Sequence, residues 1–307
     1  MSEVTALPRL PAVSLDPHDA ITRERAWSQV QAALQEYHAF TVELSMDEVG
    51  RQAVEVLLGL LDLPEPSLWR VARRSVRPDS TFEWVGYGYH RQGSIVLHET
   101  FDLGPWGAAA VDEALSSDRS GAEVTPLPSD LASGWLAAAD GLRVALGGVG
   151  RDLVSLIAWG LGLNPSVAAS RFKSNESTLR ILNYPAVEQH VAVPLRAAEH
   201  EDSGGLTFIW SDAPGLQVLT SRDDWVEVSP LTWTVICGHV ASEMTAGAVS
   251  ATTHRVVPGH GRRRSVAYFF EPDRSASVTR WPPSGDEDAP YGQDQAYGAW
   301  LARRHGA

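Results

Sequence analysis

The feature that most constrains this chain is a histidine and an aspartate two positions apart, His200 and Asp202, followed later by His254. In an extended strand every second side chain points to the same face, so His200 and Asp202 point together while Glu201 points away. If a strand carrying His254 lies opposite them, two imidazoles and one carboxylate cover one side of a metal ion. The other side stays open, which favours a ferrous ion, since structural zinc prefers a closed tetrahedron.

A second polar pattern follows His254. Arg263 and Ser265 begin an apolar run that continues to Pro272, and as alternate residues of a strand they share one face. A guanidinium offers a rigid fork of donors to a carboxylate, and a hydroxyl two residues along can donate to the same group. The pair therefore predicts a carboxylate clamp beside the metal. For Arg262 and Arg264 we expect a solvated basic turn.

Hydrophobic periodicity divides the chain into a helical first half and a strand-rich second half. Apolar residues at turn-like spacing predict helices over residues 19–37 and 47–61 and within 130–163. From Thr178 onward, short β-branched and aromatic runs bounded by Gly, Pro, Asp and Ser are typical of a sandwich or barrel. Residues 273–292 predict a surface excursion, and residues 295–304 a short terminal helix.

In order and density these patterns resemble the isopenicillin N synthase-like branch of iron(II)/2-oxoglutarate-dependent oxygenases. The matching segments are Leu179–Pro185, His200–Thr207, Gly215–Val218, Trp225–Val228, His254–Val256 and Arg263–Ser265. The resemblance is strong over roughly residues 170–272 and fainter at 10–15 and 99–104.

The resemblance implies an α+β fold with a double-stranded β-helix (jelly-roll) core flanked by helices. We expect a single oxygenase domain over residues 1–307. Its mainly helical N-terminal part would cover 1–170 with the opening strands, the jelly-roll core with the metal and cosubstrate site 171–272, and a C-terminal segment 273–307.

The resemblance also implies roles for individual residues. His200, Asp202 and His254 would ligate Fe(II), and Arg263 and Ser265 would hold the distal carboxylate of 2-oxoglutarate. Tyr184 would hydrogen-bond the same cosubstrate, with the role of a core aromatic residue as the alternative.

The implied activity is hydroxylation of a small molecule with O2 and 2-oxoglutarate, or its desaturation or ring closure. Asp202 argues against a halogenase of this family, because halogenases typically lack that carboxylate. The pattern from Cys237 and Gly238 to Gly247 is similar to bacterial enzymes of β-lactam ring expansion, which indicates bacterial secondary metabolism such as antibiotic biosynthesis. Two alternatives stay open: an iron oxidase of the isopenicillin N synthase type that does not use 2-oxoglutarate, and a non-catalytic jelly-roll that binds a ligand.

Composition excludes some partners. A formal charge of −13 disfavours nucleic acid and anionic membranes. The chain has one cysteine, Cys237, no basic-then-apolar leader and no apolar run long enough to span a membrane, so we expect a cytoplasmic protein. Phe208, Trp210 and Trp233 are candidates for lining a substrate pocket, and His239 is expected to be structural. Substrate identity and oligomeric state do not follow from the sequence.

Overall fold

The computed structural model describes residues 12–13, 20–42, 48–72, 74–75, 84–105, 108–110, 125–174, 176–188, 192–284 and 296–305. Within these ranges, no helix combines the length and the apolar composition needed to cross a bilayer.

The centre of the molecule is a large, mainly antiparallel sheet, which has nine strands among the described residues. In spatial order they are β1 (Ala12–Val13), β2 (Ala39–Val42), β13 (Trp233–Cys237), β10 (Leu206–Ser211), β15 (Arg263–Phe270), β8 (Thr178–Tyr184), β5 (Ile95–Leu103), β4 (Trp84–Gln92) and β3 (Arg74–Ser75). Strands from the first 103 residues thus occupy both ends of the sheet, around a middle built from residues 178–270.

A smaller antiparallel sheet packs on one face of the large one. Its strands are β12 (Trp225–Glu227), β11 (Leu216–Leu219), β14 (His254–Val256) and β9 (Ala197–His200). Leu216 and Val218 of this sheet share a buried apolar cluster with Ile209 and Ile236 of the large sheet. Two antiparallel sheets packed face to face, with helices outside, form the double-stranded β-helix that we expected, so the α+β jelly-roll prediction is confirmed.

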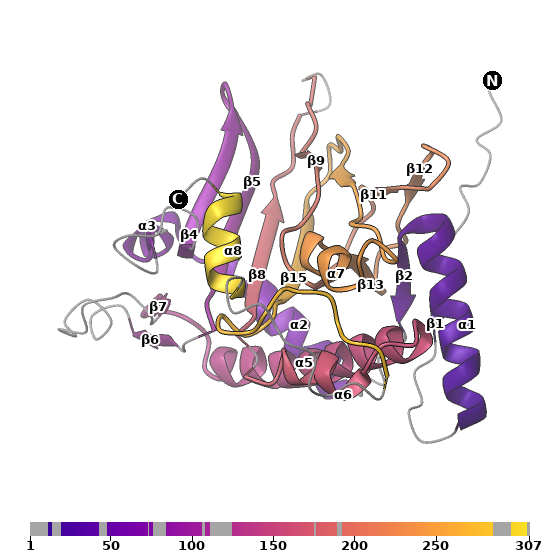
Figure 1. Cartoon of the computed structure of the whole chain (residues 1–307). Coiled ribbons are helices and arrows are strands. Elements are labelled where there is room, and N and C mark those ends of the chain that lie inside the picture. Colours follow the sequence, from indigo (N-terminus) through magenta and orange to yellow (C-terminus); the bar gives the residue numbers. More distant parts are fainter. Residues whose placement is uncertain are drawn as a thin grey trace, which may run out of the picture.

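Helices cover the opposite face of the large sheet. The helical elements are α1 (Ala20–Tyr37), α2 (Glu48–Leu58), η1 (Gly59–Asp62), α3 (Glu65–Arg70), α5 (Trp135–Gly160), α6 (Pro165–Ser170), α7 (His239–Met244) and α8 (Tyr297–Arg304). In Figure 1, α5 runs across the direction of the strands, below β8 and β15. A short parallel pair, β6 (Ala108–Ala110) and β7 (Thr125–Leu127), lies outside both sheets. The helices predicted from periodicity are confirmed, with ends displaced by a few residues.

Two glycines explain the breaks in the apolar stripe of α5. A Cβ on Gly160 would lie 2.1 Å from the ring of Trp27 on α1, and one on Gly150 would lie 2.8 Å from the ring of Phe270 on β15. Only a residue without a side chain lets these rings approach the helix. The glycines are therefore packing positions between α5 and its neighbours.

The prediction of a surface excursion after residue 272 is wrong for the described residues 273–284. Val278 and Trp281 are each 2% exposed and belong to the main core. Their burial reflects tertiary contacts that a local count of Pro, Ser and Asp does not reveal. The rest of the predicted excursion, 285–292, lies outside the described residues.

Candidate active site

The structure brings His200, Asp202 and His254 together at the edge of the small sheet. One ligand atom from each lies within 4.8 Å of the other two. His200 and His254 are direct partners across β9 and β14, with ring centroids 4.1 Å apart. Asp202 follows β9, and its Oδ1 lies 3.8 Å from Nε2 of His200 and 4.0 Å from Nε2 of His254.

Backbone carbonyls fix the orientation of both imidazoles. Nδ1 of His200 lies 2.8 Å from the carbonyl oxygen of Ala198, and Nδ1 of His254 lies 3.0 Å from that of Thr252. A carbonyl only accepts, so each Nδ1 donates a proton to it, and each Nε2 is left directed toward the same space as Oδ1 of Asp202. Burial lowers the pKa of His254, which favours the neutral form that a metal requires.

Glu201 points away from this group, as strand alternation predicts. Its carboxylate lies 2.8 Å from Nε2 of His239 and accepts a hydrogen bond from Thr253. His239, expected to be structural, is thus a partner of Glu201. The sequence alone did not identify this pairing.

Arg263 lies on the face of β15 that points toward the small sheet and is 5% exposed. Its Cζ is 4.8 Å from the ring of Tyr184, its cross-strand partner on β8. Its Nε and Nη1 have no hydrogen-bond partner among the described residues. Burial lowers the pKa of this guanidinium, and its interactions with Tyr184 and Asp212 offset the loss of water only in part. A buried cation with free donors is a binding site for an anion.

Ser265 lies beside Arg263 on the same face, but its hydroxyl is engaged. It donates to the carbonyl oxygen of Trp210 at 2.6 Å. A serine has a single O–H, so it must rotate away from Trp210 before it can donate to a bound carboxylate. The predicted role of Ser265 as a second donor to the cosubstrate stays a prediction.

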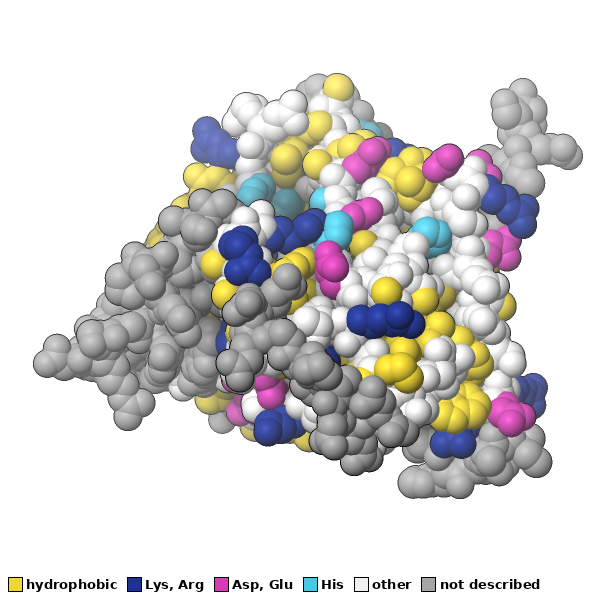
Figure 2. Space-filling view, in the orientation of Figure 1, with side chains coloured by type: hydrophobic (Ala, Val, Ile, Leu, Met, Phe, Trp, Pro, Cys, Tyr) yellow, Lys and Arg dark blue, Asp and Glu magenta, His cyan; other side chains and the backbone are white. Residues whose placement is uncertain are grey.

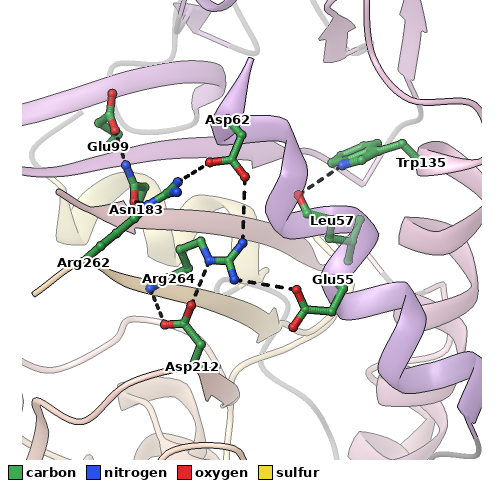
Figure 3. A network of polar contacts seen from close by, with 9 residues as sticks. All are labelled: Glu55, Leu57, Asp62, Glu99, Trp135, Asn183, Asp212, Arg262 and Arg264. Carbon is green, nitrogen blue, oxygen red and sulfur yellow. Dashed lines mark hydrogen bonds and ion pairs between the residues drawn. The ribbon is translucent and has the colours of Figure 1, made fainter. Parts of the chain in front are cut away.

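Arg262 and Arg264 turn to the other face, where both are ion-paired. The Arg262 side chain is 40% exposed, as expected of a solvated turn, whereas that of Arg264 is 23% exposed, which the expectation did not foresee. Figure 3 shows both side chains in one network with acids of α2 and η1 and with the aspartate that follows β10. Arg262 pairs with Asp62 at 2.5 Å, and Arg264 pairs with Asp212 at 2.8 Å and with Glu55 at 3.6 Å. Of the three consecutive arginines, only Arg263 faces the cavity.

A cavity of about 300 Å³ is lined by all six residues that the sequence analysis predicted for the site. They are Tyr184, His200, Asp202, His254, Arg263 and Ser265. Figure 2 shows histidine and basic side chains close together on the surface between the β4–β5 hairpin and the small sheet. The His–Asp–His group and the buried arginine thus share one cavity, and the assignment of each residue to iron or cosubstrate stays a prediction.

The aromatic candidates for the pocket lie elsewhere. Phe208, Trp210 and Trp233 pack in the core between the large sheet and the helices. On β10 the cavity is lined by Thr207 and Ile209, so Phe208 and Trp210 necessarily point to the opposite face. Phe269 of β15 is an aromatic residue that does line the cavity.

Sequence reasoning missed an ion pair in the cavity wall. Arg180 on β8 donates through Nε and Nη2 to the two carboxylate oxygens of Asp102 on β5, at 2.5 and 3.1 Å. Asp102 is 1% exposed, whereas the Arg180 side chain is 31% exposed. Arg180 could have been predicted from the sequence. It lies four residues before Tyr184 on the same strand, and the alternation of side chains places both residues on the cavity face.

Sequence reasoning also missed His98, which enters the cavity wall from β5. Its Nδ1 lies 2.8 Å from the carbonyl oxygen of Arg196, and its ring stacks on that of His90 with centroids 4.6 Å apart. Burial lowers the pKa of His98 to about 4, and the nearby charges of His90, Arg180 and Arg196 act in the same direction. His98 is therefore neutral near pH 7, with its proton on Nδ1.

Arg196 fixes the backbone around this wall. It is 2% exposed, and its guanidinium donates to the carbonyl oxygens of Val96, Leu97, Pro185 and Gly259. One side chain thus joins β5, the end of β8 and the loop before β15.

His98 should make the stability of the metal-free protein sensitive to acid. Its pKa is lower in the folded than in the unfolded chain, so below pH 6.5 the unfolded chain binds a proton that the folded chain rejects. We expect this group to remove about 2 kcal/mol of unfolding free energy between pH 7 and pH 4.5. His98→Asn keeps a donor for the Arg196 carbonyl but does not titrate.

The measurement is urea unfolding of both proteins in a chelating buffer at pH 7 and pH 4.5. The wild type should lose about 2 kcal/mol more than His98→Asn over this interval. Equal losses in the two proteins would show that His98 is not held neutral by the fold.

Comparison with known proteins agrees with this geometry. Residues 175–272 match the family model of the 2OG-Fe(II) oxygenase superfamily. The chain is 28% identical over 150 residues to a probable iron/ascorbate oxidoreductase of Dictyostelium discoideum, covering 43% of this chain and 41% of that protein. It is 29% identical over 203 residues to the 2-oxoglutarate-dependent dioxygenase htyE of Aspergillus rugulosus, covering 61% of this chain and 58% of that protein. The chain thus spans about two fifths to three fifths of these relatives.

A solved structure resembles the whole chain. A full-length Neurospora crassa protein, solved in complex with alpha-KG, superimposes with a TM-score of 0.78 at 19% identity, covering 100% of this chain and 98% of that one. At this identity the likeness concerns the fold. The match to the 2OG-Fe(II) oxygenase superfamily model thus covers the segment that contains His200, Asp202, His254 and Arg263, and the solved structure shares the double-stranded β-helix fold of the whole chain.

Proposed function

We propose that this protein is an Fe(II)/2-oxoglutarate-dependent oxygenase that hydroxylates a small molecule, or desaturates or cyclises it. The observation that carries the proposal is the pairing, in one cavity, of an open His–Asp–His group with a buried arginine whose Nε and Nη1 have no partner among the described residues. The donor set suits Fe(II), and the arginine suits the carboxylate of a keto acid. The matched relatives support the same class.

The residues would divide the work as follows. His200, Asp202 and His254 hold Fe(II) from one side. Arg263 would hold the distal carboxylate of 2-oxoglutarate, joined by Ser265 once its hydroxyl leaves Trp210, and Tyr184 would hydrogen-bond the same cosubstrate. With iron bound, the site supplies the oxidising chemistry by which one O2 converts 2-oxoglutarate and a substrate C–H bond into succinate, CO2 and a C–OH group.

The protein's own contribution is orientation and charge. The carbonyls of Ala198 and Thr252 keep both imidazoles facing the metal. Arg263 offers its charge in a site from which water is largely excluded, where a carboxylate gains more than in solvent. A cavity of about 300 Å³ that also holds the keto acid leaves room for a small substrate only, and no partner macromolecule is required.

The test is reconstitution of the wild-type protein under nitrogen with Fe(II) and 2-oxoglutarate, followed by exposure to O2. We expect one Fe(II) per chain, binding of 2-oxoglutarate by calorimetry only when a divalent metal is present, and slow release of succinate even without substrate. A protein that binds neither iron nor 2-oxoglutarate would be the non-catalytic jelly-roll instead.

A second candidate is an iron oxidase that does not consume 2-oxoglutarate. A matched relative carries an oxidase name, 1-aminocyclopropane-1-carboxylate oxidase 3 of Arabidopsis thaliana, 30% identical over 149 residues. In that case Arg263 would bind a carboxylate of the substrate itself. Iron binding without 2-oxoglutarate binding or succinate release would favour this candidate.

We further propose a cytoplasmic role in bacterial secondary metabolism, such as antibiotic biosynthesis. The support is the sequence pattern from Cys237 to Gly247, which is similar to enzymes of β-lactam ring expansion. Neighbouring genes for peptide or polyketide assembly would agree with this role, whereas a conserved neighbourhood of primary metabolism would contradict it.

A further inference from the structure

We propose that Thr207 is a positioning residue that holds Asp202 as a one-oxygen ligand and so keeps a coordination position of the iron free for 2-oxoglutarate. The inference rests on the proposed function and concerns how this chain prepares the metal site. Its starting point is that the two oxygens of the Asp202 carboxylate have different surroundings.

The difference is visible in the contacts of each oxygen. Oδ2 of Asp202 accepts a hydrogen bond of 2.6 Å from the hydroxyl of Thr207. Oδ1 lies between the Nε2 atoms of His200 and His254, at 3.8 and 4.0 Å. One oxygen is therefore directed to the metal position, and the other is engaged by a neutral donor.

The donor itself is rigidly placed. Thr207 is 2% exposed and lies on β10, where it pairs with Ile236 on one side and Phe269 on the other. Its branched side chain has few rotamers on a strand. Sliding this strand by one residue would turn Thr207 away from the cavity, and both neighbouring strands oppose that shift.

The acceptor is held as well. The backbone N–H of His239 donates to the carbonyl oxygen of Asp202 at 2.9 Å, and that of Gly238 donates to Gly205 at 2.8 Å. A Cβ on Gly238 would lie 2.3 Å from the carbonyl oxygen of Gly204, so the turn after Asp202 sits directly against the end of β13. The backbone that carries the carboxylate is therefore fixed, and the bond from Thr207 is the contact that orients the side chain.

This matters because a carboxylate can bind a metal through one oxygen or through both. With iron bound, the proposed reaction would need coordination positions for the keto acid and O2 besides those taken by His200, Asp202 and His254. If Asp202 took two positions, the keto acid and O2 would compete for those that remain. A hydrogen bond to a charged oxygen is strong enough to bias this choice.

The test compares Thr207→Val, which keeps the shape and removes the donor, with Thr207→Ser, which keeps the donor. Fe(II) affinity and 2-oxoglutarate affinity are measured separately, and near-infrared magnetic circular dichroism reports the coordination of the Fe(II) protein. For Thr207→Val we expect Fe(II) affinity to be maintained or raised, 2-oxoglutarate affinity of the iron-loaded protein to fall about 10-fold, and the ligand-field bands to shift. Thr207→Ser should restore both.

Thr234→Val is the matched control. Thr234 is also fully buried, on the neighbouring strand β13, and its hydroxyl has no partner among the described residues. Its replacement should leave both affinities and the spectrum unchanged. If Thr207→Val does not fold, Thr207→Ala carries the same comparison.

The outcomes separate this inference from the proposed function. Thr207→Val with wild-type 2-oxoglutarate affinity and an unchanged spectrum would overturn the role of Thr207, while the oxygenase would stand. A wild-type protein that binds no Fe(II) would overturn both the role of Thr207 and the proposed function, and this result would not require the variants.

Discussion

Replacing Arg263 with methionine should lower 2-oxoglutarate affinity about 100- to 1,000-fold without lowering the stability of the ligand-free protein. The affinity should fall because the variant loses a charge-assisted contact in a buried site, which costs about 3 to 4 kcal/mol. Fe(II) affinity should stay within a few fold of wild type, since Arg263 is not part of the His–Asp–His group.

The stability half of this prediction follows from the free donors. Without a ligand, Nε and Nη1 of Arg263 are buried and have no partner among the described residues. Such donors cost free energy that an apolar side chain of similar reach does not. We therefore expect the unfolding free energy of ligand-free Arg263→Met to equal the wild-type value or exceed it by about 1 kcal/mol. Calorimetry with 2-oxoglutarate and urea unfolding provide the two measurements.

Arg264→Met is the matched control from the adjacent position. Arg264 points away from the cavity and pairs with Asp212, which follows β10, and with Glu55 of α2 (Figure 3). Its loss should destabilise the protein and leave 2-oxoglutarate affinity within a few fold. If both variants lost affinity equally, or if Arg263→Met were strongly destabilised, Arg263 would be a structural arginine and the anion site would lie elsewhere.

The contrast between these arginines shows what alternation in the sequence can predict. Period two correctly assigned Arg263 and Ser265 to one face and Glu201 away from His200 and Asp202, because a strand leaves each side chain only two directions. Short strand runs bounded by turn residues predicted only a sandwich or barrel, and the resemblance to the oxygenase family specified the jelly-roll core. Alternation could not predict which residues would contact the outer face of β15. The acids that bind Arg262 and Arg264 lie about 50 to 210 positions earlier in the chain.

The missed cavity residues have a similar cause. His98 and Asp102 belong to β5, which pairs with β8 across a separation of about 80 residues, and nothing local in the sequence marks that partner. Once β5 is placed beside β8, His98 faces the cavity and Asp102 lies opposite Arg180. Residue type alone also misled for Phe208 and Trp233, since an aromatic ring suits a core as well as a pocket.

These two sides of the large sheet explain how one site can be both polar and stable. The helical side contains the main apolar cluster and the paired arginines, and it supplies most of the burial. The cavity side can therefore tolerate the unpartnered donors of Arg263 and the metal-free group of His200, Asp202 and His254. Functional residues commonly retain such locally unfavourable features when the rest of the fold compensates for them.

The metal group itself should respond most strongly to substitution. His254→Ala removes a buried imidazole whose Nε2 is directed at the proposed iron position, and we expect Fe(II) affinity to fall on the order of 1,000-fold, more than the 10- to 100-fold typical of losing a residue that only orients a ligand. Asp202→Ala should have a similar effect. Both should also abolish substrate-independent succinate release. Fe(II) affinity is measured by competition with a chromogenic chelator under nitrogen.

His239→Ala is the control within the same neighbourhood. His239 lies 2.8 Å from Glu201, one residue from Asp202, yet its side chain is outside the group that faces the metal position. Its removal should change Fe(II) affinity by a few fold at most. Comparison with His254→Ala and Asp202→Ala therefore distinguishes the loss of a metal ligand from a disturbance of the turn that carries Asp202. Wild-type affinity in both His254→Ala and Asp202→Ala would mean that the imidazole and the carboxylate do not bind iron, and a loss in His239→Ala as large as theirs would assign the effect to the turn.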